Sequence, residues 1–177
     1  MVSFATTQIR FDHSHVLALF RSYSSDLDPR VKQALVRNIT IALDIHTKLE
    51  EEIFYPALIE AGASTDIKGK SVPEHDEIRL LLMDLKTLEP SGESYDGTVM
   101  QLMRETLRHV ADEESTLLPE AERLLGARLL TIGLRMTRRR LELLRGHGAE
   151  LATNAVELAG APLLVAGQTL RRSFLGR

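Results

Sequence analysis

Two stretches of this sequence repeat the same arrangement of histidine and glutamate. Residues 46–56 and 109–119 each begin with a histidine, carry glutamate four and five residues later, and end with a proline. Shorter matching segments, Asp12-His13 and Glu74-His75, precede them, so that matched histidines are 62 or 63 residues apart. Imidazole and carboxylate groups are common protein ligands for iron, manganese and zinc. The repeat therefore predicts a metal site with internal pseudo-two-fold symmetry.

Helix geometry decides which of these side chains can meet at one ion. Residues four apart lie about 40° apart around a helix axis, so the glutamate four residues after each histidine shares its face. The glutamate five residues after it is about 140° away and points elsewhere. Each shorter segment adds one further histidine. The predicted ligands are His13, His46, Glu50, His75, His109 and Glu113.

Six ligands from four helices favour two metal ions over one. A structural zinc ion takes four ligands, which is fewer than the repeat offers. Two ions with about two histidines each, bridged by Glu50 and Glu113, would use the whole set and leave positions for a small molecule. Imidazole together with carboxylate suits iron or manganese. Buried carboxylates also need a cationic partner, because an unpaired interior charge is costly.

The other polar residues have ordinary explanations. His15 is about 160° from His13 around the same helix, and His147 lies between two glycines, so neither is expected to bind the metal. Tyr23 and Tyr55 are expected in the core, and a position one layer above the metals is the alternative for Tyr55. Glu51, Glu52 and Glu114 are expected to be solvated charges or outer supports of the site. Arg138 to Arg140 are expected to form a solvated helix face, with an anion site as the alternative.

The elements that must carry these residues are helices. Apolar residues recur every three or four positions, and almost no window alternates as a strand does. Asp28-Pro29 is a helix start, Ser71 and Glu74 have capping-box spacing, and Pro56 and Pro119 should kink or thin their helices. The expected helices cover 6–24, 29–61, 71–88 and 98–125, with a loop at 89–97.

Beyond residue 126 the sequence changes character. A fifth helix is expected over 127–145, followed by a break at Gly146-His147-Gly148, a short helix and a tail. An apolar strip at helical spacing should cover the bundle or a second subunit, and tail residues should do the same. We divide the chain into a metal-binding bundle, 1–126, and a C-terminal helical extension, 127–177, through which a homodimer could form. The strip is Leu129, Ile132, Met136 and Leu143, and the tail residues are Leu163, Leu164, Val165, Leu170 and Phe174.

Composition excludes several classes of protein. The 177 residues suffice for one domain with a substantial core. A net charge of −3 is too close to neutral for a nucleic-acid-binding surface. The chain has no cysteine, which excludes disulfides and thiolate ligands. We see neither a signal peptide nor a membrane-spanning stretch, so a cytoplasmic protein is expected.

With these residues in order, the chain resembles the hemerythrin-like, HHE-type cation-binding domains over about residues 6–126. The resemblance implies an all-α fold, an antiparallel four-helix bundle, here with an additional C-terminal helix and tail. It also implies that the six predicted ligands hold two iron ions, bridged by carboxylates and an oxo or hydroxo group, which interact with O2, NO or peroxide. Manganese or zinc would fit less well. The matching segments are Asp12-His13, His46 to Glu51 running into Phe54-Tyr55-Pro56, Glu74-His75, and His109 to Glu114 running into Leu117-Leu118-Pro119.

Two departures from the family narrow the function. In the oxygen-carrying hemerythrins a second histidine follows four residues after the first on the third helix, whereas this chain has Arg79 there. One iron would have one imidazole fewer, which favours a sensor, a weak peroxide-decomposing enzyme or iron handling over oxygen transport. The lack of cysteine weakens an iron–sulfur repair function. Iron storage without turnover, and an interaction module with a structural metal, stay open as alternatives.

Overall fold

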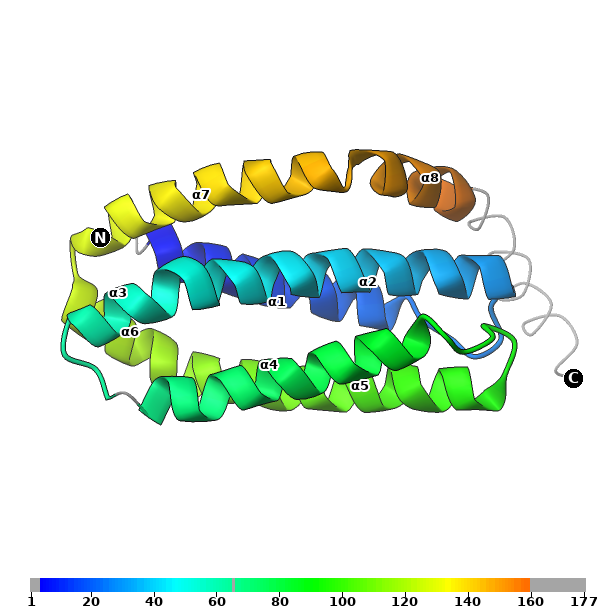
Figure 1. Ribbon diagram of the computed structural model, residues 1–177, viewed down its shortest axis with the longest axis horizontal. Helices are drawn as coiled ribbons and strands as arrows, with labels where there is room; N and C mark the ends of the chain where they lie inside the picture. The colour runs from blue at the N-terminus through cyan, green and yellow to red at the C-terminus, as the bar shows by residue number, and fades with distance from the viewer. Residues whose placement is uncertain (1–3, 65, 160–177) are drawn as a thin grey trace, which may run out of the picture.

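Antiparallel helices run along the molecule and form a bundle, as the computed structural model in Figure 1 shows. The structure describes residues 4–64 and 66–159, and these contain no strand. The predicted all-α fold, an antiparallel helical bundle, is confirmed. The helices are α1 (Phe4–Arg21), α2 (Pro29–Leu49), η1 (Glu50–Phe54), α3 (Tyr55–Glu60), α4 (Asp66–Leu85), α5 (Glu93–Asp112), η2 (Glu113–Leu117), α6 (Leu118–Leu125), α7 (Arg128–Gly146) and α8 (Gly148–Ala159).

Two apolar layers fill the bundle that α1, α2, α4 and α5 form. One layer includes Ile9 and Leu118, and the other includes Val16 and Leu102. His13 lies on α1 between Ile9 and Val16, so the apolar layers flank the polar residues of the repeat along the bundle. Burial of these layers, at roughly 25 cal/mol per Å² of apolar surface, supplies the stability that allows a polar layer between them.

Several helix boundaries differ from the expected ones. The second helix begins as predicted, with the Asp28 carboxylate accepting a hydrogen bond from the Arg30 backbone N–H. However, α4 begins at Asp66 and contains Pro73 inside the helix. A proline removes one backbone hydrogen bond, and here the helix continues through that loss. Likewise α5 begins at Glu93 and not at residue 98, because acidic residues in its first turn favour a helix N-terminus.

Both helices that carry the long repeat change to π-helical geometry within the repeat itself. The backbone N–H of Tyr55 donates to the carbonyl of Glu50, and that of Leu118 donates to Glu113, five residues back. Pro56 and Pro119 follow at once. Their rings would clash with the carbonyl four residues earlier in a regular α-helix, and they have no N–H to donate. The kink predicted at Pro56 and Pro119 is therefore a π-helical turn just before each proline. Such turns frequently occur at functional sites.

The C-terminal helices cover one side of the bundle. In Figure 1, α7 and α8 lie over α1 and α2, on the side away from α4 and α5. The predicted strip faces inward: Leu129, Ile132 and Met136 are buried in the same layer as Ile9, and Leu143 packs against it. The strip thus packs on the bundle of its own chain, while a homodimer through 127–177 stays a prediction. The predicted tail contacts of Leu163, Leu164, Val165, Leu170 and Phe174 lie outside the described residues.

Glycine allows α7 to approach α1 closely. A Cβ at Gly133 would overlap the Phe4 ring and lie 3.0 Å from the Ala5 backbone nitrogen. Gln8 on α1 also donates a hydrogen bond to the Gly133 carbonyl.

None of the helices in the described part of the chain has the length and apolar character that a membrane span requires.

Candidate metal centre

The four histidines of the repeat meet in the middle of the bundle, one each from α1, α2, α4 and α5. All four are between 0 and 4% exposed. They form two close pairs: the ring centroids of His13 and His46 are 4.9 Å apart, and those of His75 and His109 are 4.6 Å apart. Each helix therefore brings one imidazole to the same interior place, as the spacing predicted.

Glu50, the first residue of η1, lies beside two of these imidazoles. Its side chain is fully buried. Glu50 Oε2 is 3.3 Å from Nε2 of His46 and 3.4 Å from Nε2 of His75. The carboxylate thus reaches one histidine of each close pair, which is the position a bridging group would take.

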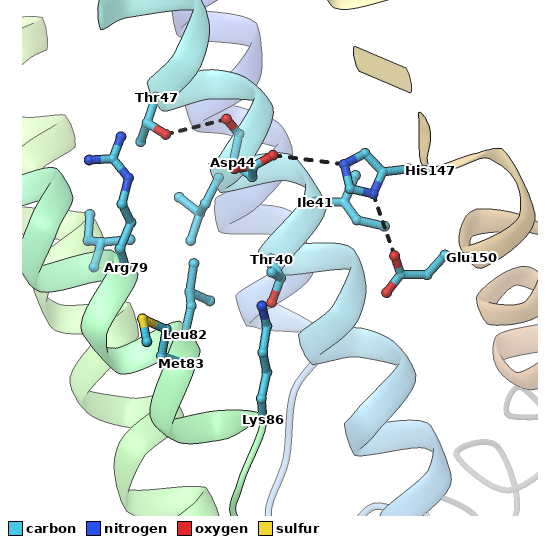
Figure 2. Close-up of a pocket in the computed structure, with 12 residues that line it drawn as sticks. Thr40, Ile41, Asp44, Thr47, Arg79, Leu82, Met83, Lys86, His147 and Glu150 are labelled. Atoms are coloured by element: carbon cyan, nitrogen blue, oxygen red, sulfur yellow. Dashed lines mark hydrogen bonds and ion pairs between the residues drawn. The ribbon is translucent and has the colours of Figure 1, made fainter. Parts of the chain in front are cut away.

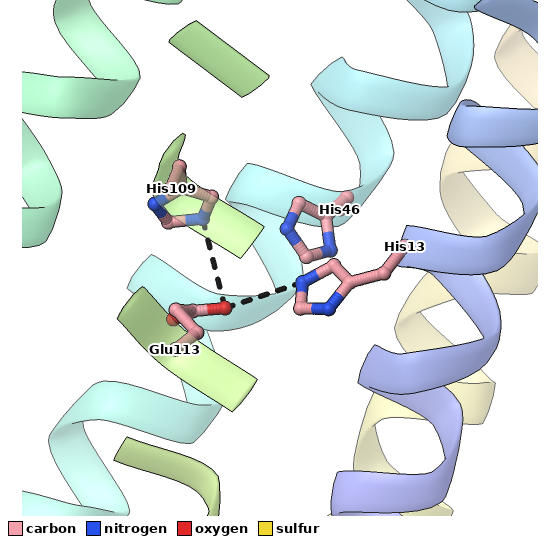
Figure 3. A group of neighbouring side chains, drawn as sticks. All are labelled: His13, His46, His109 and Glu113. Atoms are coloured by element: carbon pink, nitrogen blue, oxygen red, sulfur yellow. Dashed lines mark ion pairs between the residues drawn. The ribbon is translucent and has the colours of Figure 1, made fainter. Parts of the chain in front are cut away.

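Glu113, the first residue of η2, lies beside the other two. Its Oε2 is 3.3 Å from Nε2 of His13 and 3.6 Å from Nε2 of His109. Figure 3 shows these two rings directed at the carboxylate, with His46 next to them. The structure therefore brings together all six residues that the sequence singled out.

Several buried atoms that face this centre make no hydrogen bond, which fits a bound cation. Among the described residues, Nε2 of His13 and His46, Oε1 of Glu50 and Oε2 of Glu113 are buried without a hydrogen bond. Polar atoms left in this way are costly unless something else satisfies them. Two overlapping groups of donor atoms, each within 4.8 Å of one another, could hold a metal ion. They are His13, His46, His109 and Glu113, and Glu50, His75 and His109.

A carboxylate from a neighbouring helix faces the outer nitrogen, Nδ1, of every one of these histidines. Such partners orient the ring and direct Nε2 inward. Two of them are the glutamates five residues after a histidine, so their role is support of the site and not solvation alone. The four pairs, with the Nδ1 to oxygen distance, are Glu114 with His13 (2.9 Å), Glu51 with His75 (2.7 Å), Glu74 with His109 (3.0 Å) and Asp12 with His46 (3.8 Å).

Arginines hold two of these four carboxylates. Arg79 donates to Glu51 at 2.7 Å and to Asp76 at 2.8 Å. Arg140, on α7, donates to both oxygens of Asp12. Arg79 stands at the position where the oxygen-carrying hemerythrins have a second histidine on the third helix. It contacts Glu51, on the Nδ1 side of His75, and not the Nε2 atoms that face the interior of the centre.

Tyr55 is a residue of the centre that sequence reasoning left in the core. Its hydroxyl oxygen lies 2.7 Å from Glu113 and 3.1 Å from Glu50, so its single proton can be donated to either carboxylate, and it lies 3.5 Å from Nε2 of His75. Burial and these two carboxylates raise the pKa of Tyr55 well above its ordinary value. The phenol therefore keeps its proton and acts as a hydrogen-bond donor inside the centre.

Burial and the crowding of charges set the protonation of the metal-free centre. Burial and repulsion from His109 and His46 lower the pKa of His75 to about 2, and burial lowers the pKa of His46. Burial and the charge of Glu113 raise the pKa of Glu50. Although burial opposes it, contact with His13 and the other imidazoles lowers the pKa of Glu113. His46 and His75 are therefore neutral at neutral pH, the form in which imidazole binds a metal.

The remaining candidates lie away from the centre. His15 is exposed, and Tyr23 donates to Asp96 near the far end of the bundle. His147 pairs with Asp44 and Glu150 in a pocket of about 380 Å³ between α2, α4 and α8 (Figure 2). Arg79 lines that pocket and contacts Glu51, which places the pocket on the outer, Nδ1 side of His75.

The arginines of α7 divide between surface and site. Arg138 pairs with Glu142 on its own helix, whereas Arg139 donates to both oxygens of Glu52 on η1. Only Arg140 reaches a carboxylate that faces a histidine of the centre.

Comparison with known proteins agrees with this geometry. The chain is 33% identical over 109 residues to a Nostoc sp. (strain PCC 7120) protein named DNA nickase, a match that covers 62% of this chain but only 31% of that protein. No solved structure matches the chain. The sequence model of the hemerythrin HHE cation-binding domain matches residues 5–121. Together with the buried histidine and glutamate cluster, this match shows that the chain belongs to the hemerythrin HHE cation-binding domain family and is a metal-binding protein of that type.

Proposed function

We propose that the chain is a non-heme di-iron protein, in which His13, His46, Glu50, His75, His109 and Glu113 hold two iron ions. The observation that carries the proposal is the set of buried, inward-facing donor atoms without hydrogen bonds. Two ions account for it better than one, because the donors form two groups and Glu50 and Glu113 each lie between two imidazoles.

The donor set supports iron over zinc. It consists of imidazole and carboxylate without thiolate, which suits iron and manganese. A structural zinc ion would use four of these groups and leave the others buried without a partner. A mixed ligand set of this kind holds iron while leaving it positions for an additional small ligand.

The burial of the centre supports a small partner molecule. The four histidines are almost inaccessible, which favours a small partner such as a diatomic molecule or peroxide over a larger one. Bound iron would supply the redox chemistry toward such a molecule. The chain contributes the neutral imidazoles of His46 and His75, apolar layers that exclude water, and the Tyr55 hydroxyl, which lies within hydrogen-bond distance of both carboxylates. We therefore infer a sensor of O2, NO or peroxide, or a weak peroxide-decomposing enzyme.

The reaction of the iron-loaded protein with peroxide and with NO tests this proposal. A sensor should show a reversible optical change with little peroxide consumed, and an enzyme should decompose many equivalents of peroxide per chain. The Glu113→Ala protein should lose the response in either case. Metal that raises the melting temperature but reacts with neither molecule would refute the proposal and favour a structural metal.

A further inference from the structure

Arg140 joins the C-terminal helix α7 to the metal centre through Asp12. Its two terminal nitrogens donate to the two oxygens of Asp12 at 2.8 and 2.6 Å. Asp12 is nearly buried and Arg140 is three-quarters buried. Two parallel charge-assisted hydrogen bonds are the strongest geometry available to this pair. The position of the Asp12 carboxylate is therefore set by α7.

Of the four histidines of the centre, His46 alone has no hydrogen bond at Nδ1. The nearest Asp12 oxygen is 3.8 Å away, and this buried nitrogen has no hydrogen-bond partner among the described residues. By the internal repeat, Asp12 corresponds to Glu74, whose oxygen lies 3.0 Å from Nδ1 of His109. Asp12 therefore lies beside its histidine as Glu74 does, but it does not form the corresponding hydrogen bond.

The way in which Arg140 binds Asp12 accounts for the missing hydrogen bond to His46, as a comparison with Arg79 and Glu51 shows. Arg79 contacts Glu51 with one nitrogen and Asp76 with another, and Glu51 still lies 2.7 Å from Nδ1 of His75. Arg140 instead engages both oxygens of the shorter Asp12 side chain. An arginine on a carboxylate therefore does not by itself prevent a hydrogen bond to histidine, as Glu51 and His75 show. The bidentate contact of Arg140 keeps the Asp12 carboxylate away from His46.

We propose that Arg140 is a positioning residue of the metal centre: by holding both oxygens of Asp12, it keeps Asp12 out of hydrogen-bond range of His46 and so lowers the affinity of the centre for metal. This inference rests on the proposed metal centre. Its consequence is that docking of α7 and tight metal binding compete for one carboxylate. Coupling of this kind is reciprocal, so metal binding also weakens the grip of α7 on Asp12.

The test compares two neighbouring arginines of α7. Arg140→Met frees Asp12, whereas Arg139→Met removes an equally two-pronged contact, to Glu52, which faces no histidine. Affinity for Fe²⁺ is measured without oxygen by competition with a coloured chelator. We expect Arg140→Met to bind Fe²⁺ about tenfold more tightly, the lower end of the roughly 10–100-fold by which outer partners of ligand histidines change metal affinity. We expect Arg139→Met to match the wild type.

Two further measurements separate positioning from a merely structural role. The gain should vanish in Arg140→Met/Asp12→Asn, because the two changes act through one contact. In NMR spectra of the Co²⁺-loaded protein, the imidazole N–H of His46 should exchange with water faster than those of the other three histidines, and slow down in Arg140→Met. A structural role would lower the melting temperature without tightening metal binding or slowing this exchange.

Each result decides the matter. Unchanged or weaker Fe²⁺ binding by Arg140→Met overturns the inference, and so does a gain that persists without Asp12. If Arg140→Met cannot be purified, Arg140→Lys replaces it, because a single ammonium cannot hold both oxygens and should give a smaller gain in the same direction. A wild-type protein that binds neither Fe²⁺ nor Co²⁺ overturns the proposed function as well, which distinguishes the two failures.

Discussion

At the scale of single residues, Tyr55 shows how a buried hydroxyl makes two like charges tolerable. Glu50 and Glu113 approach each other inside an apolar bundle, where two unshielded carboxylates would repel strongly. The Tyr55 hydroxyl donates toward both, and the raised pKa of Glu50 means that the metal-free centre carries less negative charge than two carboxylates would. A bound cation would take over this task from the hydroxyl.

Replacement of Tyr55 by Phe should therefore destabilise the metal-free protein more than the metal-bound one. The metal-free loss is expected to be about 1–3 kcal/mol, the cost of leaving a buried polar group without its hydrogen bond. Urea unfolding of both forms measures it. Tyr95→Phe is the control, since Tyr95 is buried in the apolar layer with Leu102 and should not change the effect of metal. An equal loss in both forms of Tyr55→Phe would contradict this role.

The glutamates of the repeat should separate by position. Glu50→Gln and Glu113→Gln remove inward-facing donors and should abolish most metal binding. Glu51→Gln and Glu114→Gln remove only the acceptors beside His75 and His13, so the protein should keep its metal with roughly 10–100-fold lower affinity. Glu52→Gln, which loses only the Arg139 contact, is the control and should bind like the wild type. Equal losses at all four repeat positions would refute the distinction between inner and outer carboxylates.

At the scale of elements, the π-helical turns explain both the success and the limit of sequence reasoning. Spacing of four residues predicted the histidine and glutamate pairs because each pair lies before or at the start of the π turn. Tyr55 lies five residues after Glu50, about 140° away on a regular helix. The π turn adds one residue to the turn and brings Tyr55 back by about 100°, onto the face of Glu50. The contacts of Asp12 and Glu74 with histidines of other helices depend on bundle geometry, which no spacing along one helix reveals.

Replacement of glycine by alanine should have opposite effects on stability at Gly133, where α7 packs against α1, and at Gly97, where the surroundings are open. Gly133→Ala should destabilise the protein by about 1–3 kcal/mol, because its methyl group would overlap Phe4 and the Ala5 backbone. Gly97→Ala, in α5, meets nothing within 4 Å and should stabilise by about 0.5–1 kcal/mol through helix propensity. Urea unfolding gives both values. Stabilisation by Gly133→Ala would show that α7 does not pack against α1 as closely as described.

At the scale of the whole molecule, the bundle and the C-terminal extension share one core. The sequence correctly predicted that Leu129, Ile132 and Met136 form a packing strip, because their spacing follows the helical period. It could not predict that Arg140 ends at Asp12, since a run of arginines on a helix gives no sign of its partners. The division of the chain at residue 126 stays a prediction. All six proposed ligands lie before residue 126, which favours the division, but α7 packs against the bundle that carries them, which opposes it.

A fragment of residues 1–126 tests that division. It should still bind iron, since it contains every proposed ligand, but it should melt at a lower temperature and associate through the surface that Leu129 and Met136 now cover. Calorimetry and light scattering of the metal-bound fragment measure both effects. A soluble, helical fragment that binds no iron would show that the extension is part of the metal-binding unit.

The central claim is that this bundle holds two iron ions. Elemental analysis of protein purified from iron-replete cells, with the protein concentration from amino-acid analysis, tests it most directly. The account predicts two iron ions per chain, and a large loss of iron in the Glu50→Ala and Glu113→Ala proteins. One metal ion per chain, or one equivalent of zinc in place of iron, would contradict it.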